Sequence, residues 1–221
     1  GPSHREYGTL GGNLCLDTRC VFYNQSEWWR SANAYCLKYR GEICHVAPGG
    51  KKCFAAFSGD VAPALLLFDA EVEIAGPDGR RRLALADLYR NDGMDHLTLG
   101  QGELLVAVHM AKPSEPVNSA YAKSRVRGSI DFPLAGVAVR MAVADGKISD
   151  LRVGLTGISP LPFLVRKLES YIGRAPDQAC MEQLRDAVRG QAKAMKTTFT
   201  PPHYRRRVAG ALAQKLAESI I

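Results

Sequence analysis

The spacing of hydrophobic and polar residues divides this chain of 221 residues into three kinds of sequence. Residues 14–57 have almost no regular period, whereas short alternating segments between residues 61 and 110 are typical of strands and hairpins. More strands are expected up to residue 156, and from residue 161 the spacing becomes helical. Because a run of helices follows the strands instead of alternating with them, the pattern predicts an α+β fold.

The first half of the chain is predicted to contain a small hairpin sheet and one short helix. Pro63 is tolerated in the first turn of a helix, and the sequence Gly76-Pro77-Asp78-Gly79 predicts a tight turn. We expect a buried helix at 61–69, strands at 71–75, 80–85 and 104–110, and a helical turn at 86–90.

A proline-containing segment at 112–116 is expected to separate this half from a second subdomain. Asp145-Gly146 is a typical hairpin turn between two of the strands that follow. We expect strands near 119–125, 134–144 and 148–156, then helices at 161–172, 177–195 and 201–220. These elements predict a three-stranded antiparallel sheet with helices packed on one of its faces.

The composition is that of a soluble globular protein, with 46% hydrophobic and 23% charged residues and a mean hydropathy of −0.13. No apolar run is long enough to span a bilayer and no secretory signal opens the chain, so we expect a cytoplasmic protein without a membrane partner. Residues 1–4 resemble a protease-cleavage remnant of a tag. The net charge of +7 is scattered and lacks a nucleic-acid motif, so no nucleic-acid partner is expected.

Six cysteines are the most unusual feature of the sequence, because five of them fall between Cys15 and Cys53. Their spacing is Cys15-x4-Cys20-x15-Cys36-x7-Cys44-x8-Cys53. Clustered cysteines without a secretion signal favour metal or cluster binding over disulfides. A metal centre would also explain how residues 14–57 become ordered without a hydrophobic pattern. From spacing alone, an iron–sulfur cluster and a structural zinc are equally open, and the spare cysteine is undecided.

Three other short motifs point to a bound phosphate or cofactor only when they are taken together. The glycine-rich turn at 9–13 can aim backbone N–H groups at phosphate oxygens, although many surface turns contain two glycines. Asp60 has the ordinary interpretation of a helix N-cap, and Lys123 that of an exposed strand lysine.

In combination, these motifs resemble the flavin-binding subunit of the xanthine dehydrogenase and carbon monoxide dehydrogenase superfamily. The matching stretches are Thr9-Leu10-Gly11-Gly12-Asn13, Ser58-Gly59-Asp60-Val61-Ala62-Pro63, Leu155-Thr156-Gly157-Ile158-Ser159-Pro160 and Tyr204-Arg205-Arg206-Arg207-Val208-Ala209. The cysteine-rich insertion between the first two stretches resembles the β subunit of the 4-hydroxybenzoyl-CoA reductase type, which carries an additional [4Fe–4S] cluster.

The resemblance implies two cofactor sites. The cluster ligands fall on Cys20, Cys36, Cys44 and Cys53, which leaves Cys15 and Cys180 unligated. The flavin-binding residues fall on Thr9, Gly11, Gly12, Asn13, Asp60 and Lys123. The turn would donate to the FAD pyrophosphate, Asp60 would accept from sugar or ribityl hydroxyls, and Lys123 would favour the anionic reduced ring.

The resemblance also implies how the chain is divided. Residues 5–112 would form the second FAD-binding subdomain, with a mixed sheet, helices and the cluster loop at 14–57. Residues 117–221 would form the C-terminal α+β subdomain. The first glycine-rich FAD turn of the family lies in a preceding subdomain of roughly a hundred residues, so we expect only half of the FAD site here.

The function implied is electron relay, with no catalytic residue in this chain. Electrons would pass from a ferredoxin-like donor through the [4Fe–4S] cluster and FAD to partner subunits that carry [2Fe–2S] centres and the molybdenum cofactor. The alternatives are a zinc-stapled binding module without redox chemistry, and the flavin subunit of another aromatic or heterocycle dehydrogenase of the same superfamily.

Overall fold

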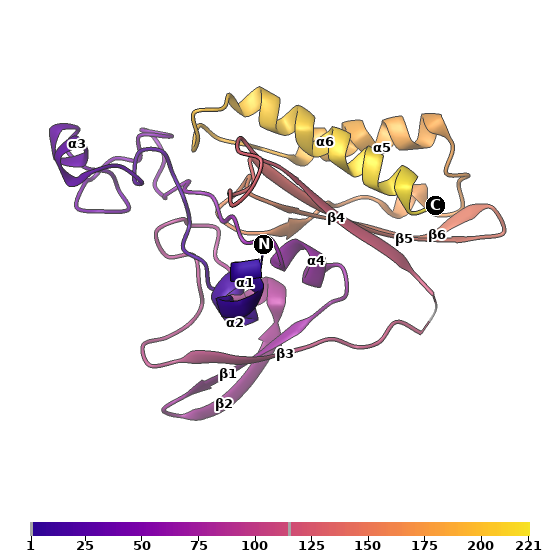
Figure 1. The fold of residues 1–221 in the computed structure, drawn as a ribbon, viewed down its shortest axis with the longest axis horizontal. Helices are drawn as coiled ribbons and strands as arrows, with labels where there is room; N and C mark the ends of the chain where they lie inside the picture. Colours follow the sequence, from indigo (N-terminus) through magenta and orange to yellow (C-terminus); the bar gives the residue numbers. More distant parts are fainter. Residues whose placement is uncertain (1, 115) are drawn as a thin grey trace.

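The computed structural model describes residues 2–114 and 116–221, so Gly1 of the expected tag remnant and Glu115 of the expected linker lie outside the described residues. It contains two antiparallel sheets with α4 between them, and α5 and α6 cover one face of the larger sheet (Figure 1). The α+β class expected from the sequence is therefore confirmed. Among the described residues, none of the helices has the length and hydrophobicity that a membrane crossing requires.

The first half of the chain forms a three-stranded sheet and several short helices. Its helices are α1 (Pro2–Tyr7), α2 (Leu10–Leu14), α3 (Glu27–Ala32) and α4 (Ala62–Leu66), and a 3₁₀ turn spans Leu85–Leu88. Its strands are β1 (Glu71–Gly76), β2 (Gly79–Ala84) and β3 (Leu104–His109), in the order β2-β1-β3. Both pairings are antiparallel, so the expectation of a mixed sheet was wrong for these strands. The antiparallel hairpin follows from the tight turn at Pro77 and Asp78.

The second half forms a sheet of four strands with two long helices. The strands are β4 (Asn118–Ser124), β5 (Ala135–Ala144), β6 (Lys147–Thr156) and β7 (Phe163–Leu164), and the helices are α5 (Gln178–Gln191) and α6 (Pro202–Ser219). The buried core lies between this sheet and the two helices, and it includes Met141, Val153, Met181 and Leu184.

The helix expected at 161–172 was wrong. Phe163 and Leu164 pair with Leu155 and Gly154 as a fourth strand, and only Glu169–Tyr171 form a 3₁₀ turn. Pro162 disfavours a helical conformation in the residue before it, and pairing at the free edge of β6 satisfies backbone groups that would otherwise stay unpaired.

The cysteine-rich stretch is almost free of regular structure, as its sequence predicts. Between residues 15 and 57 the helix α3 stands at the far tip of the molecule (Figure 1), and isolated bridges supply the remaining backbone pairing. One bridge closes the base of the stretch, because Arg19 and Ala56 exchange two backbone hydrogen bonds of 2.8 Å each.

The two halves are joined by more than the proline-containing segment. Phe57 N donates to Ser159 O at 2.9 Å, and Gly157 N donates to Phe57 O at 2.8 Å. A Cβ on Gly154 would lie 2.5 Å from Pro63 O, so β6 packs directly on the backbone of α4. The segment that leads to Asp60 is therefore held against the C-terminal sheet.

Candidate functional site

The glycine-rich turn begins helix α2 and is stabilised by its own first residue. Thr9 is the N-cap, and its hydroxyl accepts a hydrogen bond of 3.0 Å from Gly12 N. A Cβ on Gly12 would lie 2.9 Å from that hydroxyl oxygen, so glycine is needed for the close approach. Gly11 instead lies against Leu105 of β3.

Asn13 joins this turn to the segment that carries Asp60. Its Oδ1 accepts a 3.0 Å hydrogen bond from Val61 N. Its backbone oxygen would lie only 2.7 Å from a Cβ on Gly59. Two segments that are nearly fifty residues apart in the sequence are thus fixed side by side, and the cysteine-rich stretch leaves the fold between them.

Asp60 and Lys123 lie together, as the motifs suggested, but they bond to each other. Lys123 Nζ donates to Asp60 Oδ2 at 2.5 Å, and the Tyr121 hydroxyl donates to Asp60 Oδ1 at 2.7 Å. Burial is the largest cause that raises the pKa of Tyr121, and the Asp60 carboxylate raises it further, so the phenol keeps its proton. The carboxylate is thereby held in one orientation by two side chains of β4.

Asp60 and Lys123 line a cavity of about 900 Å³, which is large enough for a dinucleotide-sized ligand. Its lining includes the predicted Thr9, Gly12, Asn13, Asp60 and Lys123. Gly11 is the one predicted flavin residue that does not line it. Ser58, Asp131 and Phe132 complete the wall on the side of the cysteine-rich stretch.

The four cysteines assigned by resemblance line a second, much smaller cavity. Cys20, Cys36, Cys44 and Cys53 are 7%, 8%, 4% and 5% exposed, and none of them forms a disulfide. Burial is the first cause that raises the pKa of Cys20, and it raises that of Cys53 to about 11. The Cys44 thiol raises the pKa of both Cys20 and Cys53 further, because like charges in one cavity repel each other.

Backbone N–H groups lie close to two of these cysteines. Ala55 N donates to Cys53 Sγ at 3.4 Å, and the nearby backbone N–H groups of Phe22 and Tyr23 lower the pKa of Cys20, although burial outweighs them. Such bonds stabilise thiolates and are typical of iron–sulfur sites. The donor set therefore fits a thiophilic metal centre.

The described residues contain no group of three or more His, Cys, Asp or Glu side chains already arranged to hold a metal ion. The same four cysteines nevertheless line one cavity. The structure therefore provides four buried thiols around one cavity as possible ligands. It does not provide a preformed coordination sphere among the described residues.

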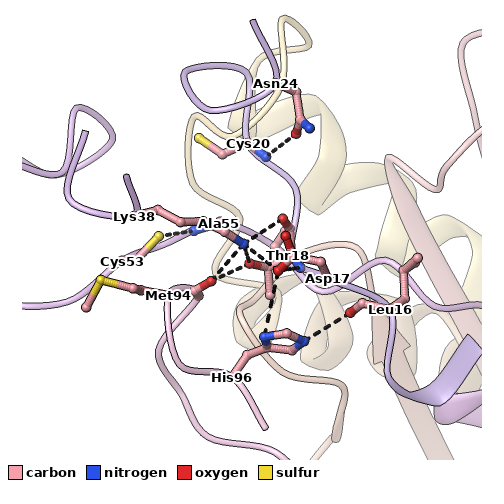
Figure 2. A network of polar contacts seen from close by, with 12 residues as sticks. Leu16, Asp17, Thr18, Cys20, Asn24, Lys38, Cys53, Ala55, Met94 and His96 are labelled. Atoms are coloured by element: carbon pink, nitrogen blue, oxygen red, sulfur yellow. Dashed lines mark hydrogen bonds and ion pairs between the residues drawn. The ribbon is translucent and has the colours of Figure 1, made fainter. Parts of the chain in front are cut away.

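Lys38 borders the cysteine cavity and anchors it to the scaffold (Figure 2). Its side chain is 6% exposed, and Nζ donates to Asp17 Oδ1 at 2.6 Å and to the backbone oxygens of Thr18 and Gly93. The positive charge lowers the pKa of Cys53, although burial outweighs this effect. Lys38 therefore brings a positive charge to the edge of the cysteine cavity.

The remaining cysteines and His45 have other surroundings. Cys15 ends helix α2 and is partly buried, and Cys180 lies in the C-terminal core as a small apolar side chain. His45 Nε2 lies within hydrogen-bond distance of Tyr35 O, and its ring packs on Phe22. His45 is therefore a hydrogen-bonding neighbour of the cysteine site.

Sequence reasoning missed Tyr121 and Arg205. Tyr121 is two residues from Lys123 in a strand, so the alternation of side chains could have placed both on one face. Arg205 is completely buried within a run of three arginines, and no local signal distinguishes it from Arg206 and Arg207.

Comparison with known proteins identifies the family. Residues 1–113 match the FAD binding domain in molybdopterin dehydrogenase, and residues 119–220 match the CO dehydrogenase flavoprotein C-terminal domain. The chain belongs to the FAD-binding subunits of the molybdopterin dehydrogenase family. The resemblance to this superfamily, seen first in its short motifs, is confirmed.

Individual relatives place the chain within this family. It is 31% identical over 224 residues to the aldehyde oxidoreductase FAD-binding subunit PaoB of Escherichia coli K12, covering 97% of this chain and 68% of the relative. It is 32% identical over 129 residues to the xanthine dehydrogenase FAD-binding subunit of E. coli O157:H7, covering 58% of this chain. That alignment covers 44% of the relative, so the chain matches less than half of its length.

The fold is also that of a solved structure of the Cu,Mo-CO dehydrogenase in its cyanide-inactivated form. The superposition has a TM-score of 0.72 at 22% identity and covers 99% of this chain and 62% of the other. At this identity the likeness is one of fold.

Proposed function

We propose that this chain is part of an electron-transfer subunit in which FAD occupies the 900 Å³ cavity and Cys20, Cys36, Cys44 and Cys53 hold a [4Fe–4S] cluster. The enzyme would be of the 4-hydroxybenzoyl-CoA reductase type, a proposal that rests on the cysteine-rich stretch. Its partners would be a ferredoxin-like donor, a [2Fe–2S] subunit and a molybdenum-cofactor subunit.

The observation that supports electron transfer between the two sites is that three cavities adjoin one another in a row. Cys20 lines both the cysteine cavity and a neighbouring cavity of about 440 Å³. Ser58, Asp131 and Phe132 line this intermediate cavity and also the flavin cavity. The two candidate cofactor sites therefore lie on either side of one intermediate cavity, which supports the proposal that electrons pass between them.

Four of the predicted residues have a part in the proposed flavin half-site. Gly12 lets the turn approach a phosphate closely, and the Thr9 hydroxyl, which accepts from Gly12 N, keeps its own proton to donate to the phosphate. Asp60 oxygens keep free lone pairs after bonding to Tyr121 and Lys123, so they can still accept from ligand hydroxyls. Lys123 holds a positive charge at the cavity wall, where it favours a bound ring that gains negative charge.

Metal analysis of anaerobically purified protein tests the proposal. We expect about four irons per chain, because four thiolates are the usual ligands of one [4Fe–4S] cluster. We also expect a broad visible absorption that dithionite bleaches. One zinc per chain and no iron would instead support the zinc-stapled module.

A matched pair of variants tests the ligand assignment. Cys36 and Cys180 are both buried, but only Cys36 lines the cysteine cavity. We expect Cys36→Ser to abolish the chromophore and Cys180→Ser to leave it intact. Equal behaviour of the two variants would refute the assignment.

A further inference from the structure

Arg205 carries a fully buried positive charge that the flavin half-site does not use. Its side chain is 0% exposed in the first turn of α6. Its guanidinium donates to the backbone oxygens of Leu134 at 2.9 Å and Met195 at 2.8 Å, to that of Gly157, and to Thr197 Oγ1 at 2.9 Å. Every one of these acceptors is neutral.

A buried cation without an anionic partner is costly, because desolvation of an ion costs several kcal/mol. Within the part of the chain that the structure describes, none of the hydrogen-bond partners of Arg205 is a carboxylate. Lys38, the other buried cation near the cysteines, differs because Asp17 lies 2.6 Å from its Nζ. The charge of Arg205 therefore remains available to another anion.

Cys20 can supply this anion once it ligates a metal as a thiolate, whereas Asp131 of the same cavity already accepts from the backbone N–H groups of Val126 and Arg127. Arg205 and Cys20 line the same intermediate cavity. Burial lowers the pKa of Arg205 to about 10, and interaction with the Cys20 thiolate acts in the opposite direction. A backbone hydrogen bond of 2.8 Å from Val21 N to Thr197 O ties the residue after Cys20 to the loop that cradles the guanidinium.

We infer that Arg205 acts on the centre held by the four cysteines, as the uncompensated cation that raises its reduction potential. The inference rests on the proposed function. Uptake of one electron makes a thiolate-ligated centre more negative, so a nearby positive charge stabilises the reduced state more than the oxidised state. Arg205 is a positioning and tuning residue here, because it does not coordinate the metal.

The experiment is a spectroelectrochemical titration of the reconstituted cluster in this chain. Arg205→Gln removes the charge, and Arg205→Lys keeps it while losing the planar set of hydrogen bonds. We expect a clearly lower midpoint potential for Arg205→Gln and a value close to wild type for Arg205→Lys. Arg140→Gln is the control, because Arg140 is also largely buried and bonds Leu67 O, but it pairs with Asp150 and lines neither the cysteine cavity nor the intermediate cavity.

A second pair keeps the test valid if Arg205→Gln does not fold. Thr197→Asp places a carboxylate on the guanidinium, and Thr197→Asn is its neutral match in size. We expect a lower potential for the Asp variant than for the Asn variant. The inference would be overturned if Arg205→Gln kept the wild-type potential, or if Arg205→Lys lowered the potential as much as Arg205→Gln does. Equal potentials of Thr197→Asp and Thr197→Asn would also overturn it.

The outcomes separate this inference from the proposed function. If the wild-type chain binds no iron under anaerobic reconstitution, the cluster itself is refuted and no potential is measured. If the cluster forms with four irons and its potential is the same in all Arg205 and Thr197 variants, only the role of Arg205 is refuted.

Discussion

Thr156 joins the C-terminal sheet to the segment that presents Asp60, and Thr156→Val tests how much this joint contributes. Its side chain is fully buried at the end of β6, and Oγ1 lies 2.9 Å from Gly59 O and 3.3 Å from Phe57 O. Phe57 O keeps a second donor, Gly157 N at 2.8 Å. Valine preserves the shape of the side chain but deprives Gly59 O of this donor.

The expected loss follows from the unsatisfied carbonyl. A buried acceptor left without a partner costs about 1–3 kcal/mol of unfolding free energy. For a chain of this length each kcal/mol corresponds to roughly 2–4 °C in the melting temperature. We therefore expect a lower urea midpoint, and faster amide exchange at residues 57–61, because the break is local.

Thr156→Ser is the matched control. It keeps the hydroxyl and removes the γ-methyl, which lies 2.6 Å from where a Cβ on Gly136 would be. We expect a cost of about 0.8 kcal/mol for the lost methyl group, with amide exchange at 57–61 unchanged. An unfolding free energy of the Val variant within about 0.5 kcal/mol of wild type would contradict the role given to this hydrogen bond.

Three further outcomes are expected. Chelation should expose new tryptic sites in the cysteine-rich stretch, at Lys38, Arg40, Lys51 and Lys52, because metal ligation contributes to its order; equal resistance with and without metal would show that packing alone holds it. Flavin fluorescence titration should show weak FAD binding, since by resemblance only one of two phosphate-binding turns is present; tight stoichiometric binding would contradict this. Burial lowers the pKa of His96 in the folded chain, so its contribution to stability is present above about pH 6.5 and lost as pH falls below it. In His96→Gln the urea midpoint should depend less on pH between pH 7 and 5 than in the wild type. An unchanged pH dependence would show that other groups cause the loss of stability.

The sequence predicted local features well and long-range burial poorly. The strands β4 to β6 and the helices α5 and α6 lie within a few residues of their predicted ranges, because each is a long segment with a regular hydrophobic period. The strand β7 was missed, since two residues carry no period and their pairing depends on the free edge of β6.

The same distinction applies to the candidate sites. Asp60 and Lys123 were expected in one site and do lie together, but their mutual bond depends on how β4 packs against the segment at 57–61. The cradle of Arg205 is made of carbonyl groups from residues 134, 157 and 195, which the sequence gives no reason to bring together. Local patterns thus identified the chemistry, and tertiary packing decided the partners.

The bridge between Arg19 and Ala56 makes the cysteine-rich stretch a module that can be gained or lost. All four candidate ligands lie between these two residues, whose backbones are already paired. Because the free energy of loop closure depends only weakly on loop length, a short turn or a long insertion can join these two residues at similar cost. A flavoprotein of this fold could therefore acquire a second redox site in a single insertion, without altering the residues that line the flavin cavity.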